Sequence, residues 1–142
     1  DAQQLMQDLE IDYTLFFKQL ETYSKTSDFK THFKEVFYSK TTDEQFARLN
    51  EFLFIYQDRL AKNTISKTDS LKMMKEANPK FILRNYLLFE CINELNDGKK
   101  DLLNKLLIAL ENPYKEIYPE FSVKRPAEYD DQTGCSTLSC SS

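Results

Sequence analysis

The stretch that decides the fold is PKFILRNYLLFECINELN, residues 79–96. Its apolar side chains point in nearly every direction around an α-helix, whereas the other apolar stretches of the chain lie along a single helical face. Pro79 suits the first turn of a helix, where its missing N–H would have no partner. Gly98 suits the left-handed residue that follows a helix. The stretch therefore predicts a central helix from Pro79 to Asn96 that is buried on all sides.

Five further stretches carry apolar residues three or four positions apart, which is the spacing of one helical face. The sets are Leu5, Leu9, Tyr13, Phe16, Leu20 and Tyr23; Phe29, Phe33, Val36 and Phe37; Phe46, Leu49, Phe52, Leu53, Tyr56 and Leu60; Leu71 and Met74; and Leu102, Leu103, Leu106, Leu107 and Leu110. We expect one continuous helix for each set. The prediction is an all-α fold of five or six packed helices.

Residues with short polar side chains stand where these helices are expected to begin. The candidate caps are Ser27 or Asp28, Thr42 with Gln45 in capping-box spacing, and Asp101. The helix of the fourth set is expected to start at Thr68 or Asp69. The fourth set is expected to end near Asn78, because Pro79 disfavours helical angles in the residue before it.

The apolar pattern stops at Pro113. Pro119 and Pro126 interrupt the sequence beyond it, and almost no apolar residue follows Tyr129. We predict a helical domain over residues 1–112 and an irregular, extended tail over residues 113–142.

The composition excludes several kinds of active site. The 142 residues include 2 glycines and 1 histidine. Nucleotide-binding loops of the GxGxxG kind need three glycines for turns and close backbone approach, and most catalytic zinc sites use two or three histidines. We therefore predict no catalytic, cofactor-binding or metal-binding residue in this chain, and His32 is expected at the surface or at its boundary.

The charge pattern gives no sign of a polyanionic partner. The formal net charge is -4 and the sequence pI is about 5.1, which does not favour nucleic acid or an anionic membrane. No apolar run reaches the roughly 18 residues that span a bilayer. We expect solvated helix faces for the basic stretch from Lys67 to Arg84 and for the scattered carboxylates. These are Asp8, Glu10, Asp12, Glu21, Asp43 and Glu44.

The three cysteines fall into two groups. Cys91 lies within the apolar pattern of the central helix, where a thiol acts as a small hydrophobic group. Cys135 and Cys140 lie near the end of the chain and are expected to be accessible to solvent unless the tail docks. The four residues between them differ from the two-residue spacing of zinc and dithiol motifs. They can pair with each other, pair with a distant cysteine, or remain two ordinary thiols.

Several motifs of the chain are similar to the C-terminal end of the selenoprotein O family. They are NPKFILRNYL at 78–87, NPY at 112–114, KRP at 124–126 and GCSTLSCSS at 134–142, with weaker similarity at Asp12-Tyr13-Thr14 and at Tyr56, Arg59 and Leu60. Departures occur at Phe52 and Tyr129, where many members have Trp, and at Ile55, where many have Arg.

The resemblance implies a larger enzyme. Members of this family have a kinase-like fold and transfer AMP from ATP to hydroxyl side chains of proteins, with Mg or Mn as the metal. Their nucleotide- and metal-binding residues lie in an N-terminal part that this chain does not contain, so no catalytic residue carries over. The expected partners are that kinase-like part and its protein substrates. Since the chain begins at Asp1, without a visible targeting segment, we expect a fragment of a cytoplasmic or, in a eukaryote, mitochondrial protein.

The resemblance also assigns a role to one cysteine. Cys140 matches the position where eukaryotic members place selenocysteine, which is thought to form a reversible bridge to the kinase-like part. Cys135 belongs to the surrounding pattern. The sequence is thus interpreted as a C-terminal helical domain that supports the catalytic lobe and carries a redox-responsive cysteine.

Two alternatives remain at this point. The chain can be a free-standing helical adaptor that binds a protein partner through an exposed aromatic groove and has no enzymatic activity. It can also be a secreted helical protein in which Cys135 and Cys140 form a disulfide.

Overall fold

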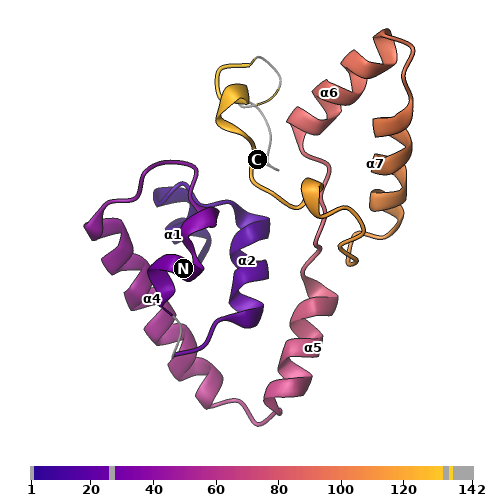
Figure 1. Ribbon diagram of the computed structural model, residues 1–142. Helices are drawn as coiled ribbons and strands as arrows, with labels where there is room; N and C mark the ends of the chain where they lie inside the picture. Colours follow the sequence, from indigo (N-terminus) through magenta and orange to yellow (C-terminus); the bar gives the residue numbers. More distant parts are fainter. Residues whose placement is uncertain (1, 26–27, 133–134, 136–142) are drawn as a thin grey trace. The chain divides into compact units, whose positions relative to one another are not determined.

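The described residues of the chain fall into two helical units, one within Asp1–Ala77 and the other within Asn78–Ser142. A computed structural model describes residues 2–25, 28–132 and Cys135 (Figure 1). Unit 1 contains α1 (Ala2–Asp8), α2 (Tyr13–Thr22), α3 (Phe29–His32), the 3-10 turn η1 (Lys34–Val36), α4 (Asp43–Ala61) and α5 (Lys67–Ala77). Unit 2 contains α6 (Asn85–Asn96), α7 (Asp101–Glu111) and the 3-10 turns η2 (Pro119–Phe121) and η3 (Ala127–Tyr129). The predicted all-α class is confirmed, while the division after Ala77 differs from the boundary expected at residue 112.

The first predicted helix is in fact two helices. The prediction of one helix from Leu5 to Tyr23 is wrong, because α1 ends at Asp8 and α2 begins at Tyr13. Between them Glu10 has a φ of 51°, which is a left-handed conformation that no α-helix contains. Ile11 then forms an antiparallel bridge with Phe37. Tertiary pairing thus replaces helical hydrogen bonds at this point.

Asp12 holds this break together from a buried position. Its side chain accepts a hydrogen bond from the backbone N–H of Leu15 at 2.9 Å and another from the hydroxyl of Tyr38. Its own N–H donates to the carbonyl of Val36 at 2.7 Å. Because only 1% of Asp12 is exposed, the expectation of a solvated carboxylate is wrong here. The residue is the N-cap of α2 and joins it to the segment after η1.

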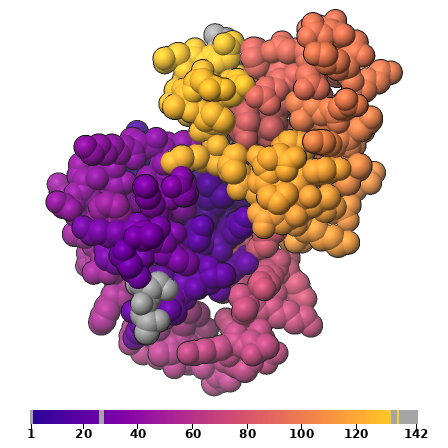
Figure 2. All heavy atoms as spheres, viewed as in Figure 1, coloured from indigo at the N-terminus to yellow at the C-terminus, as the bar shows by residue number. Residues whose placement is uncertain are grey.

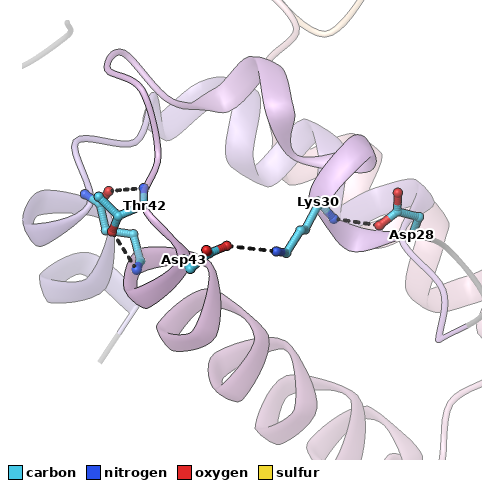
Figure 3. A network of polar contacts seen from close by, with 5 residues as sticks. Asp28, Lys30, Thr42 and Asp43 are labelled. Carbon is cyan, nitrogen blue, oxygen red and sulfur yellow. Dashed lines mark hydrogen bonds and ion pairs between the residues drawn. The ribbon is translucent and has the colours of Figure 1, made fainter.

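Two other predicted caps of unit 1 are confirmed. Thr42 and Gln45 exchange the two hydrogen bonds of a capping box, at 3.2 and 2.9 Å. Asp28 caps α3, and the hydroxyl of Thr31 lowers the pKa of that carboxyl by donating to it. Figure 3 shows both caps beside the ion pair of Lys30 with Asp43, at 3.2 Å. The alternative cap Ser27 lies outside the described residues.

The core of unit 1 is built mainly from aromatic and leucine side chains. The rings of Phe16 and Phe33 are fully buried with centroids 5.5 Å apart, and Leu49 and Leu53 of α4 pack in the same cluster. α5 has no buried residue and contributes Met74 to the edge of this core. It begins at Lys67, before the predicted Thr68 or Asp69, because the hydroxyl of Ser66 accepts the N–H of Asp69 at 3.0 Å.

In unit 2, α6 begins six residues later than the predicted start. The N–H groups of Lys80 and Phe81 both donate to the carbonyl of Pro113, at 2.7 and 3.1 Å. The hydroxyl of Ser122 donates to the carbonyl of Lys80 at 2.7 Å. These bonds to residues after α7 hold the chain before α6 in a non-helical form, so the predicted start at Pro79 is wrong.

The end of α6 follows the prediction. Gly98 has a φ of 77°, and its N–H donates to the carbonyl of Leu95 at 3.0 Å while that of Lys99 donates to Glu94 at 2.9 Å. This pair of bonds is the Schellman motif. α7 differs at its start, because Asp101 is its first residue and not its cap; the N-cap is Lys100, without a side-chain hydrogen bond.

Burial of α6 is one-sided within unit 2. Tyr86, Leu87 and Cys91 are buried, and Figure 1 shows α7 alongside this helix. Leu88 and Ile92 remain 44% and 49% exposed. The prediction of burial on all sides is therefore wrong for the chain as it stands.

Leu87→Ala is expected to lower the free energy of unfolding by roughly 2 to 5 kcal/mol, because it leaves a cavity where 3% of the leucine is exposed. Urea denaturation of the 142-residue chain measures this change. Leu88→Ala is the matched control and should lower it by less than about 1 kcal/mol. Equal effects of the two substitutions would contradict this account of α6.

Asp12→Ala is expected to cost roughly 1 to 3 kcal/mol, since α2 loses its cap and the hydroxyl of Tyr38 loses its acceptor. Thermal unfolding followed by circular dichroism provides the measurement. Asp43→Ala is the control because the Asp43 side chain is 98% exposed. An unchanged midpoint for Asp12→Ala would show that the break between α1 and α2 does not depend on this carboxylate.

Candidate functional site

The residues after α7 fold back onto α6 and α7 within unit 2. The ring of Phe121 is buried against Phe81, with centroids 5.9 Å apart, and against Tyr118 at 5.5 Å. Lys105 of α7 adds an ion pair to Glu120 at 3.7 Å. The extended tail expected over residues 113–142 therefore does not describe all of residues 113–132, because two 3-10 turns form within them and Phe121 is buried.

Tyr129 fixes the last described turn to α6. Its ring contacts those of Tyr86 and Phe89, at 5.3 and 6.4 Å between centroids, and its hydroxyl donates to the carboxylate of Glu90. This hydrogen bond, aided by partial burial and nearby negative charge, raises the pKa of Tyr129 from 10.0 to about 12. In Figure 2 the yellow segment that carries Tyr129 covers one side of α6.

Cys135 lies at the end of this packed segment. Its N–H donates to the carbonyl of Gln132 at 3.0 Å, and the residue is 1% exposed. Its thiol is free. The sequence predicted an accessible thiol at Cys135 unless the tail docks. The segment that carries Cys135 does dock, and the thiol is therefore buried. Cys140, the principal predicted redox residue, lies outside the described residues.

The other residues discussed in the sequence analysis differ in their exposure to solvent. Cys91 is buried with a free thiol, as the apolar pattern predicted. His32 is half-buried, and its Nε2 lies 2.9 Å from the carbonyl oxygen of Gln19. Arg84 is 3% exposed, so it does not belong to a solvated basic face. Lys67 and Lys72 of the same stretch are exposed.

Unit 1 contains an open, mainly apolar groove of about 580 Å³. It lies between the ends of α2 and α4 and the start of α5. Its lining includes Tyr23, Tyr56, Leu60, Ile65, Leu71 and Met74. The hydroxyl of Tyr56 donates to the sulfur of Met74 at 3.7 Å. Nothing among these side chains has the arrangement of an acid, base or nucleophile.

The described part of the chain holds neither a metal-binding cluster nor a membrane-spanning helix. Its His, Cys, Asp and Glu residues form no group of three or more that could hold a metal ion. Of the helices in the same residues, none combines the length and apolar character needed to cross a membrane.

Comparison with known proteins gives the family. Residues 1–111 match the sequence profile of the family described as "Protein adenylyltransferase SelO". The chain belongs to this family. The resemblance seen in the sequence motifs is thereby confirmed.

Individual members of the SelO family align with nearly all of the chain. Protein nucleotidyltransferase YdiU of Cytophaga hutchinsonii is 35% identical over 144 residues, which cover 99% of this chain and 27% of that protein. The proteins of the same name from Xanthomonas oryzae and Flavobacterium johnsoniae are 33% and 32% identical, over 97% of this chain and 27% and 28% of their own lengths. The chain thus spans just over a quarter of the length of these relatives.

Sequence reasoning missed the contact of Tyr129 with Glu90. The available signal was Glu90 itself, the one charged residue within YLLFECI at 86–92. A carboxylate in an apolar helical stretch requires either solvent or a hydrogen-bond donor. The donor could not be identified from the sequence, because it lies 39 residues away.

Tyr129→Phe is expected to lower the free energy of unfolding by about 1 to 2 kcal/mol at neutral pH, because Glu90 loses its donor. The raised pKa means that the folded state binds the phenolic proton more tightly than the unfolded state. The advantage of the parent chain is therefore full below pH 10 and is lost as the pH rises through about 12. Urea denaturation between pH 7 and the alkaline limit measures the difference.

The control for this prediction is Tyr114→Phe, which changes a tyrosine that is 53% exposed. It should alter the free energy of unfolding by less than about 0.5 kcal/mol at neutral pH. A difference between parent and Tyr129→Phe that stays constant up to pH 12 would contradict the assigned hydrogen bond.

Proposed function

We propose that this chain is the C-terminal region of a protein adenylyltransferase that transfers AMP from ATP to Ser, Thr or Tyr hydroxyls of other proteins. The observation that carries the proposal is the alignment of 99% of this chain with 27% of a protein nucleotidyltransferase. In such a protein the kinase-like part performs the chemistry and this helical region supports it. We propose a cytoplasmic location for the parent enzyme.

ATP and Mg or Mn belong to the other part of the enzyme in this proposal. The described residues of this chain do not fit them, since they lack a cluster of metal-ligand side chains and the one glycine among them, Gly98, ends a helix. In this proposal the residues of this chain take no part in the catalytic step. Their contribution is to hold the C-terminal segment in a defined place.

The second component of the proposal is redox regulation by Cys140. Its thiol and a thiol of the kinase-like part form a disulfide by exchange with a small disulfide compound, which takes up the two electrons and two protons and leaves as two thiols. The anchoring of the preceding segment through Tyr129 and Phe121 supports this role, because a fixed starting point limits the volume that the last residues search. Cys135 lies buried in the same segment, and we propose only a secondary redox role for it.

The test is AMP transfer by the full-length gene product, with ATP and Mg or Mn, under reducing and oxidising conditions. The parent protein is expected to transfer AMP and to change its rate between the two conditions by at least threefold. Cys140→Ser is expected to have the same rate in both. Ser139→Ala, a small change at the neighbouring position, is the control and should behave like the parent.

The outcomes separate the components of the proposal. A rate that depends equally on redox conditions in the parent and in Cys140→Ser would remove the switch. A full-length product without AMP transfer, or a reading frame without sequence upstream of Asp1, would favour the helical adaptor. Calorimetry of the 142-residue chain is expected to show no Mg-dependent binding of ATP, and measurable binding would place a nucleotide site in this region.

A further inference from the structure

Helices α6 and α7 together expose six large apolar side chains. We define the α6–α7 apolar surface as Leu88, Ile92, Leu95, Leu107, Ile108 and Leu110, which are between 38% and 50% exposed. The three residues of α6 are four and three positions apart, so they form one row along the helix. Single exposed apolar residues are ordinary, whereas a row of them along one helix is typical of a surface that contacts another molecule or segment.

The sequence of α6 independently indicates that this surface is buried against another part of a protein. A helix that is apolar on nearly every side is characteristic of a buried position. Unit 2 covers the side that carries Leu87 and Cys91 with its own residues, and Tyr129 covers another part. The row of Leu88, Ile92 and Leu95 is the part of the pattern that unit 2 leaves uncovered.

The exposed apolar residues of unit 1 do not form a similar row. Those among its described residues are Tyr13, Phe54, Ile55, Ile65 and Met73. They are spread over α2, α4, α5 and the loop before α5. Such scattered residues are expected on any protein surface.

We propose that the α6–α7 apolar surface packs against the part of the longer protein that precedes Asp1. This inference rests on the proposed function, which places a catalytic part there. The relatives have almost three quarters of their length outside the region that matches this chain, which is ample material for a cover. A segment of the same polypeptide also has a high effective concentration and so competes well against a second copy of the protein.

The experiment uses the full-length protein and two adjacent positions of α6. Ile92 or, as the matched control, Asn93 is replaced by the photo-cross-linking amino acid p-benzoylphenylalanine. Both residues are exposed here, but successive residues point about 100° apart around a helix. Position 92 is expected to cross-link to peptides that precede Asp1, with a yield at least fivefold above that of position 93.

A measurement without substitutions protects the test against misfolding of the variant. Hydroxyl-radical footprinting of the parent full-length protein compares Ile92 with Ile117, which are 49% and 41% exposed in this structure. Ile92 is expected to be oxidised at least fivefold more slowly than Ile117. Equal rates would show an uncovered surface and overturn the inference.

The remaining outcomes also decide the question. Cross-links from position 92 only to residues 2–77, or only between two copies of the protein, would overturn the inference by identifying another cover. AMP transfer is measured on the same protein. A product that transfers AMP but gives either of these other cross-links refutes this inference alone, whereas the expected cross-links without AMP transfer refute the proposed activity alone.

Discussion

Helix α6 sets the constraint on which unit 2 depends. It carries apolar side chains on nearly every side, and exposing any of them to water is unfavourable in free energy. α7 and the residues after it cover the side with Leu87 and Cys91. The chain before α6 is held by the carbonyl of Pro113, which belongs to the segment that leads away from α7. The other residues of unit 2 thus pack around α6, and they bury only part of its surface.

Unit 1 depends on a different kind of interaction, which is local and polar. Asp12 is buried, yet its carboxylate accepts hydrogen bonds from the N–H of Leu15 and the hydroxyl of Tyr38. These donors offset the cost of removing a charged group from water. The arrangement follows the left-handed backbone of Glu10 between α1 and α2 and brings Ile11 beside Phe37. The aromatic core then packs around this fixed point.

Membership of the SelO family gives the two units a context. The chain matches just over a quarter of the length of its relatives, and in the proposed function it is one part of a larger enzyme. In that proposal, a further part of the protein covers the exposed side of α6 and meets the C-terminal segment that is anchored on this helix. The segment places Cys135 in the core of unit 2, so that of the two terminal cysteines the proposed redox role rests on Cys140.

The sequence by itself determined the helical class, the caps at Thr42 and Gly98, the packing of Cys91 and the family. These depend on residues within about four positions of one another, or on motifs that survive in relatives. Only the tertiary structure decided where α1 ends, where α6 begins and how the segment after Pro113 docks. Each of these depends on a partner far along the chain: Val36 for Asp12, Pro113 for Lys80 and Glu90 for Tyr129. A periodic pattern shows that a side chain is suited to burial, but the partner that buries it is chosen by the folded chain.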